Sequence, residues 1–252
     1  YAALKNNPGE IVKAAARHRL INFARYMQPD LALEPFHVVY YTLLDKFAHG
    51  EIKKMIVQMP PQHGKSEGSS RKLPAFMLGL NPDTKICIGS YAATIARDFN
   101  RDVQRIIDTP KYREIFPKTF LNGSNVVTMA NTYLRNSDVI EMVGHKGLLR
   151  VVGRGGALTS KTVDVMIMDD VYKDYSEGNS PIVRNAAWKW YTTVVKKRLH
   201  NKSQELIVFT RWHEEDLIGK IEKGGEKIID IKSWDSIKNI PDGAWVRINF
   251  EA

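Results

Sequence analysis

A short turn in the first third of the chain has residues that are typical of phosphate binding. It reads Pro60-Pro-Gln-His-Gly-Lys-Ser-Glu67 and joins an expected strand to an expected helix. The free N–H groups and the dipole of a helix N-terminus attract an anion at such a turn. Gly64 lets the backbone approach phosphates closely, Lys65 would contact the β- and γ-phosphates of ATP, and the Ser66 hydroxyl would ligate Mg²⁺. We expect the nucleotide-binding residues of this loop to be Gln62, His63, Gly64, Lys65, Ser66 and Glu67.

Two adjacent acids end the strongest strand pattern in the chain, Val163-Asp-Val-Met-Ile-Met-Asp-Asp170. One carboxylate can hold Mg²⁺ through water while its neighbour orients and deprotonates an attacking water. The alternative is that both acids only end the strand and cap the turn that follows. Together with the phosphate-binding turn, the acids predict hydrolysis of a nucleotide.

Short apolar strands alternate with longer helical segments along the chain. This alternation predicts an α/β fold with a mostly parallel central sheet and helices on both faces, as in P-loop NTPases. The strand at 85–90 comes between the two motif strands in the sequence. We expect it to separate them in the sheet as well, which is the arrangement of motor-type (ASCE) ATPases. The expected helices are 10–27, 36–49, 65–80, 92–108, 181–200 and 214–223; the expected strands are 54–59, 85–90, 125–129, 139–143, 148–152, 163–170, 205–210, 227–231 and 245–248.

The composition is that of a basic globular protein of 252 residues. Its formal charge is +9, from 37 Lys plus Arg against 28 Asp plus Glu, and such a charge favours a polyanionic partner such as nucleic acid. Cys87 is the one cysteine, which excludes a disulfide framework and a cysteine zinc site, and we expect it to be a buried strand thiol. No stretch approaches the ~18 apolar residues of a membrane span. We expect a cytosolic protein that is a piece of a longer chain.

Three motifs together resemble the large terminase subunit of tailed bacteriophages. They are 59–67, 166–170 and Phe209-Thr-Arg-Trp-His-Glu-Glu-Asp-Leu217, and the resemblance runs from about residue 33 to residue 223. It implies a motor that uses ATP and Mg²⁺ to translocate double-stranded viral DNA into a procapsid in the host cell cytoplasm. The implied partners are the small terminase subunit, the portal and further copies of the chain in a ring.

The resemblance also implies a division of the chain into three parts. Residues 1–50 would be an N-terminal helical segment that contributes to the adenine side of the site, and residues 51–223 the ATPase core. Residues 224–252 would be a tail toward the RNase H-like nuclease that follows the ATPase in this family. That tail is too short for a nuclease, so we expect the motor half alone.

Site residues follow from the resemblance motif by motif. Lys65 and Ser66 fall on the Walker A lysine and hydroxyl, and Asp169 falls on the Walker B metal acid. Asp170 falls on the catalytic carboxylate, where many motors have Glu. Thr210 falls on the coupling motif, where a hydroxyl can sense the γ-phosphate; the alternative is a plain turn at the end of a strand.

Two positions depart from the pattern of such loops. The usual first glycine of a phosphate loop is Met59 here, and Gln62 stands where related loops often carry Arg. A catalytic arginine must therefore come from elsewhere. We expect Arg154, which glycines flank on both sides, to be an exposed and mobile cation; Arg150 and Lys161 are alternatives, and all three could instead contact DNA or solvent.

His37 lies where the family places its adenine pocket. It could contact the edge of the base, and the alternative is that it caps a helix.

Two stretches without acids, 144–161 and 184–202, flank the Walker B strand. They could bind DNA phosphates without regard to sequence, or be solvated faces. We expect Trp188 and Trp190 to belong to the core. The alternatives to a packaging motor are a helicase-like translocase and a DNA-binding assembly module whose nucleotide site is structural.

Overall fold

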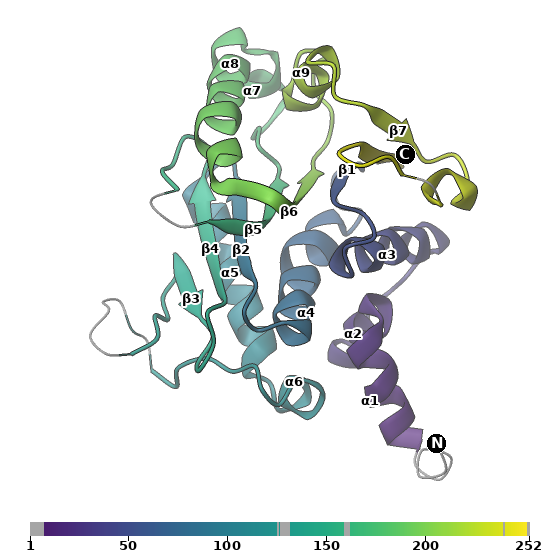
Figure 1. Ribbon diagram of the computed structural model, residues 1–252, viewed down its shortest axis with the longest axis vertical. Helices are drawn as coiled ribbons and strands as arrows, with labels where there is room; N and C mark the ends of the chain where they lie inside the picture. The colour runs from purple at the N-terminus through teal and green to yellow at the C-terminus, as the bar shows by residue number, and fades with distance from the viewer. Residues whose placement is uncertain (1–7, 125, 127–131, 159–161, 239, 251–252) are drawn as a thin grey trace.

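One eight-stranded sheet forms the centre of the protein, in the order β3-β4-β2-β5-β6-β1-β8-β7. The computed structural model describes residues 8–124, 126, 132–158, 162–238 and 240–250 (Figure 1). Strands β3 and β4 are antiparallel, and the other neighbouring pairs are parallel. The strands are β1 (Lys54–Gln58), β2 (Lys85–Ser90), β3 (Val139–Glu141), β4 (Leu148–Gly153), β5 (Val163–Asp169), β6 (Leu199–Val208), β7 (Ile228–Asp230) and β8 (Trp245–Asn249).

Helices cover both faces of this sheet, as the sequence predicts. Helices α1 to α6 pack on one face, where Val165 and Ile167 of β5 belong to the core. Helices α8 and α9 pack on the other face, with Met166 and Met168. Successive side chains of a strand point to opposite faces, so a strand covered on both sides reads as a continuous apolar run. The helices are α1 (Pro8–His18), α2 (Leu20–Met27), α3 (Pro35–Ala48), α4 (Leu73–Leu80), α5 (Ala93–Asp108), α6 (Pro110–Ile115), α7 (Tyr175–Asn179), α8 (Pro181–Trp190) and α9 (Leu217–Lys223).

The strand that separates the two motif strands is β6, and the expectation of 85–90 in this place is wrong. Strand β6 pairs with β1 on one side and with β5 on the other. Strand β2 pairs with the far side of β5. The extra strand expected of a motor-type ATPase is therefore present, but it comes from later in the chain, because crossover connections let sequence order and sheet order differ.

Two expected helices are interrupted in the structure. The helix expected at 10–27 breaks at Arg19, whose backbone is extended, and Asp45 accepts a hydrogen bond from the Leu20 N–H (2.7 Å). The helix expected at 181–200 ends at Trp190. A π-helical turn (Tyr191–Val195) and a 3₁₀ turn (Lys196–Arg198) lead from there into β6, which begins six residues before the expected 205.

Two further boundaries differ from expectation. After the phosphate loop the chain passes through a π-helical turn, Glu67–Lys72, before α4. Helix α9 begins at Leu217, since Asp216 caps it by accepting from the Gly219 N–H (3.0 Å). The strand expected at 125–129 lies outside the described residues except for Val126, which bridges to Arg135.

The segment expected as a tail contributes two strands to the sheet. Strand β8 pairs in parallel with β1, with Trp245 opposite Lys54, and β7 pairs with β8 at the edge. The Trp245 side chain is buried, and its Nε1 donates to Glu226 Oε2 (2.9 Å). These strands therefore lie beside the strand that leads into the phosphate loop. No helix of the described segments has the length and apolar character that crossing a bilayer requires.

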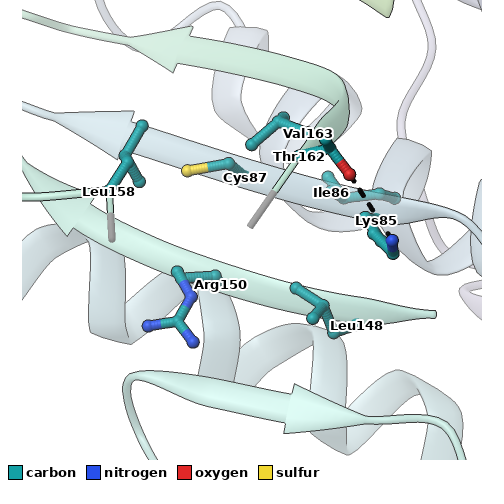
Figure 2. A pocket seen from close by; sticks show the side chains of 8 residues that line it. All are labelled: Lys85, Ile86, Cys87, Leu148, Arg150, Leu158, Thr162 and Val163. Carbon is teal, nitrogen blue, oxygen red and sulfur yellow. Dashed lines mark hydrogen bonds between the residues drawn. The ribbon is translucent and has the colours of Figure 1, made fainter. Parts of the chain in front are cut away.

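A small cavity lies at the opposite edge of the sheet from the phosphate loop, where β2, β4 and β5 begin (Figure 2). Cys87 faces it and is buried, as expected, and burial raises the pKa of its thiol to about 12. At the mouth of the cavity Lys85 Nζ donates to Thr162 Oγ1 (3.5 Å). A thiol with this pKa stays protonated near neutral pH and is a poor nucleophile.

Removal of the Trp245 side chain should destabilise the whole domain. We expect Trp245→Ala to lower the free energy of unfolding by about 3–5 kcal/mol, because a fully buried indole is replaced by a cavity. The measurement is urea denaturation followed by far-ultraviolet circular dichroism. Trp234→Ala is the matched control, since that ring is 47% exposed. Equal stability of both variants would show that β8 does not belong to the cooperative core.

Candidate active site

The three motifs meet at the ammonium group of Lys65. Lys65 Nζ lies 3.0 Å from Asp170 Oδ2 and donates to Thr210 Oγ1 (3.3 Å), and Thr210 Oγ1 donates in turn to the Met59 carbonyl (3.2 Å). These residues follow β1, β5 and β6, which are adjacent and parallel. The carboxyl edge of a parallel sheet is where ligands of such folds bind. The structure thus brings the turn, the acid and the threonine to one point.

The phosphate loop presents unpaired backbone donors. Gln62 and Gly64 adopt φ values of 63° and 76°, and the loop then enters the helix at Lys65. Within the described part of the chain, the N–H groups of Gly64, Lys65 and Ser66 donate to no backbone acceptor. Free N–H groups at a helix start are suited to an anion, because the dipole and the donors act together.

Asp169 is buried and retains one oxygen without a partner. Its Oδ2 accepts from Ser70 Oγ (2.5 Å), whereas Oδ1 has no hydrogen bond. Burial and the neighbouring Asp170 carboxylate raise the pKa of Asp169, and Ser70, Ser66 and Lys65 oppose this rise. A buried carboxylate oxygen with no partner beside a serine hydroxyl fits Mg²⁺, which prefers oxygen ligands and keeps water or phosphate oxygens in its shell.

Other protein ligands for a metal are not gathered nearby. Over the described residues there is no group of three or more His, Cys, Asp or Glu side chains that could hold an ion. The donor set of Ser66 and Asp169 therefore fits an ion that takes most of its ligands from substrate and water. Ser70 was not expected from the sequence, although it lies one helical turn after Ser66.

Asp170 is held in an unusual backbone conformation. Its φ is 44°, its N–H donates to the Val208 carbonyl (3.0 Å), and its carbonyl accepts from the Tyr91 N–H (2.8 Å). A positive φ is uncommon for a residue with a side chain, and such residues are held by their surroundings at functional sites. Burial raises the pKa of the Asp170 carboxyl, and Lys65 partly offsets the rise. A raised pKa brings a carboxylate closer to the range of a useful general base.

Arg154 is not the exposed, mobile cation that its flanking glycines suggest. Its side chain is 15% exposed, and Nη1 donates to the Val171 carbonyl (2.7 Å) and to Glu177 Oε2 (2.8 Å). The guanidinium also lowers the pKa of Glu177. Gly153 allows close packing, since a Cβ there would lie 2.7 Å from the Ala93 nitrogen. The expectation fails because α7, distant in sequence, supplies the carboxylate. Of the two alternatives, Arg150 lies within β4 and lines the small cavity at the opposite edge of the sheet, and Lys161 lies outside the described residues.

His37 caps a helix, which was the alternative interpretation of this residue. The Glu34 N–H donates to His37 Nδ1 (2.9 Å), and the Glu34 side chain caps α3 in return. Because Nδ1 accepts, the proton lies on Nε2, which donates to the His63 carbonyl (3.1 Å). Tyr40, one turn later, donates to the Lys65 carbonyl (2.5 Å), a contact that sequence reasoning missed.

The two basic stretches are only partly exposed. Arg184 is buried, where it donates to the Gly178 carbonyl (3.0 Å) and lies 3.5 Å from Glu215, so it cannot contact DNA. Lys196 pairs with Glu205 (2.9 Å). Trp190 is buried and Trp188 packs against the same cluster, as expected. The exposed side chains of the stretch 184–202 that could still reach phosphates are Lys189, Lys197 and Lys202.

Comparison with known proteins points to one family. Residues 56–245 match the family model described as terminase large subunit, T4likevirus-type, N-terminal. No curated protein matches the chain.

Solved structures resemble the chain in fold. The crystal structure of the HK97 bacteriophage large terminase superposes with a TM-score of 0.55 at 14% identity, and covers 94% of this chain and 44% of that one. An arginine-to-alanine variant of the Thermus phage P74-26 large terminase ATPase domain superposes with a TM-score of 0.53 at 14% identity. The match covers 88% of this chain and 83% of that one. The chain thus spans less than half of the HK97 protein, and at these identities the likeness concerns the fold.

Substitution of Gly64 should weaken phosphate binding. We expect Gly64→Ala to lower the affinity for Mg²⁺-ATP by at least about tenfold, because the positive φ becomes strained and the new Cβ would lie 3.2 Å from His37 Nε2. Isothermal titration calorimetry measures the change. Gly50→Ala is the control: its φ is also positive (78°), yet nothing lies within 4 Å of a Cβ there. Equal affinity of the two variants would contradict the assignment of the loop.

Proposed function

Because the chain belongs to the family of terminase large subunits, we propose that it is an ATP-hydrolysing motor that translocates double-stranded viral DNA into a procapsid. The observation that carries this proposal is the position of the Lys65 ammonium, between Asp170 and Thr210 and next to the buried Asp169. A phosphate-binding turn, a pair of acids and a strand-end hydroxyl at one point are the parts that phosphoryl transfer to water requires.

In the proposed mechanism the loop binds the β- and γ-phosphates of ATP through the N–H groups of Gly64, Lys65 and Ser66. The γ-phosphate competes with Asp170 for the Lys65 ammonium, since both are anions within its reach. Release from Lys65 leaves the Asp170 carboxylate free to orient and deprotonate the attacking water. Ser66 and Asp169 would hold Mg²⁺, which supplies charge neutralisation at the phosphates when bound.

Thr210 would report the state of the site to the rest of the motor. Its hydroxyl contacts both Lys65 and the Met59 carbonyl at the end of β1. Displacement of Lys65 toward a phosphate removes one of these contacts. The same segment continues to Arg211, whose Nε donates to the α9 cap, Asp216 (2.7 Å). A change at Thr210 can therefore reach α9 through a short chain of contacts.

DNA would contact the exposed lysines of 184–202 through its phosphate groups, which are negatively charged whatever the base sequence. The proposed partners are double-stranded DNA, the small terminase subunit, the portal of the procapsid and further copies of the chain in a ring, all in the host cell cytoplasm. Residues 1–50 would serve as the adenine side and residues 51–223 as the ATPase core; residues 224–252 would connect to a nuclease and also contribute β7 and β8 to the sheet of that core.

Replacement of the proposed base should separate binding from turnover. We expect Asp170→Asn to keep ATP bound but to lower kcat by roughly 10²-fold or more, which is the scale of general-base catalysis. Lys65→Ala should abolish hydrolysis and weaken binding. The assay is phosphate release with and without duplex DNA. If Asp170→Asn is nearly silent while Glu177→Gln is severe, the base has been misassigned; a parent that binds ATP but never hydrolyses it would favour an assembly module.

Arg154 should act on the site of a neighbouring subunit, because Gln62 leaves the loop without an arginine of its own and a guanidinium stabilises the transferring phosphoryl group. To do so it must leave Glu177. We expect Arg154→Ala to bind ATP normally and to be inactive alone. Mixed with Lys65→Ala, which contributes an intact Arg154, it should recover hydrolysis, measured where light scattering confirms assembly. Lack of recovery at every ratio would restrict Arg154 to its contact with Glu177.

A further inference from the structure

Helix α3 lies directly against the phosphate loop and bonds two of its carbonyl groups. His37 Nε2 donates to the His63 carbonyl (3.1 Å), and Tyr40 OH donates to the Lys65 carbonyl (2.5 Å). The two side chains are three residues apart, so they lie on the same face of the helix. The Phe36 ring adds a contact to the loop, with its centre 6.0 Å from the His63 ring. Helix and loop therefore form one packed unit.

These two bonds contribute to the direction of the loop's N–H groups, together with Ser69 Oγ, which also donates to the Lys65 carbonyl (2.8 Å). In a trans peptide the C=O and the following N–H point in opposite directions, and the described chain has no cis peptide bond. The His63 carbonyl points to α3, so the Gly64 N–H points away from it. The Lys65 carbonyl also points to α3, so the Ser66 N–H does the same. Both N–H groups donate to no backbone acceptor in the described residues and are available to an anion.

The His37 ring is itself fixed. Its Nδ1 accepts from the Glu34 N–H in the cap of α3, so Nε2 carries the proton and serves as the donor to the loop. Neither nitrogen remains free for the edge of a base. The packing leaves little space, because a Cβ on Gly64 would lie 3.2 Å from His37 Nε2 and one on Gly68 would lie 2.6 Å from the Tyr40 ring.

We infer that His37 and Tyr40 are positioning residues that orient the N–H donors of the loop toward a triphosphate, and that His37 does not read the adenine base. They act through the backbone of residues 63–66. The chemistry recognised is the triphosphate, which is shared by all nucleoside triphosphates and by inorganic tripolyphosphate. This inference rests on the proposed nucleotide site and replaces the expectation that His37 contacts adenine.

The variant His37→Asn separates the two bonds of the ring. The side-chain oxygen of an asparagine occupies nearly the place of Nδ1 and can still accept from the Glu34 N–H, but asparagine has no atom that reaches the place of Nε2, so the donor to His63 is lost. We expect Mg²⁺ with a non-hydrolysable ATP analogue, and Mg²⁺ with inorganic tripolyphosphate, both to bind about tenfold more weakly, since hydrogen bonds to charged groups are of this magnitude. The melting temperature should stay close to that of the parent.

Tyr40→Phe tests the second bond independently, and covers the case in which His37→Asn does not fold. It should also weaken the binding of the ATP analogue and of tripolyphosphate by the same factor. Tyr41→Phe is the matched control, because Tyr41 is a neighbouring buried tyrosine whose hydroxyl makes no hydrogen bond within the described residues. In steady-state assays KM for ATP should rise more than kcat falls, because Lys65, Asp170 and Thr210 are unchanged. GTP and ATP should be affected by the same factor.

The outcomes are distinct. Weaker binding of the ATP analogue with intact tripolyphosphate binding would overturn the inference in favour of base recognition by His37. Unchanged binding of both ligands in both variants would show that the loop holds its shape without α3. A parent protein that binds neither ligand would overturn the nucleotide site itself, and this failure is seen before any variant is made.

Discussion

The Lys65 ammonium is the group on which the arrangement of the site depends. A cation whose side chain is only 9% exposed must have an anionic or polar partner, and Lys65 takes Asp170 and Thr210. Those partners follow β5 and β6, so they reach Lys65 only because β6 lies between β1 and β5. The partners that Lys65 requires are therefore available only with this order of strands in the sheet.

The C-terminal segment of the described chain reinforces the strand that carries this loop. Strand β8 pairs with β1 on the side away from β6, and the Phe250 N–H donates to the Gln58 carbonyl (2.9 Å). The Phe250 ring then lies 5.8 Å from Phe36 and 6.2 Å from Tyr40 of α3. The strand and the helix that contact the phosphate loop are thus packed against the C-terminal segment, and this packing gives the loop a defined backbone shape before any ligand binds.

Tertiary contacts decide which positively charged side chains of this protein remain free on the surface, and runs of basic residues in the sequence do not. Stretches without acids look free along the chain, yet Arg154 meets Glu177 and Arg184 meets Glu215 once the chain is folded. Buried or half-buried cations acquire partners because an unpaired one is costly. The positive surface of the two stretches without acids is consequently smaller than the sequence suggests.

The sequence by itself determined the α/β class and placed the loop 60–67, the Asp169–Asp170 pair and Thr210 at the ends of strands, because apolar runs and turn residues encode strand ends locally. It did not determine which strand lies next to β1, or that residues 245–249 complete the sheet, because those pairings join positions about 150 to 190 apart in the chain, such as Lys54 with Glu205 and with Trp245. The contact of His37 with His63 and that of Arg154 with Glu177 could not be predicted from the sequence either. A side chain's role depends on which donor or acceptor the fold places within about 3 Å of it, and only the tertiary structure decides that.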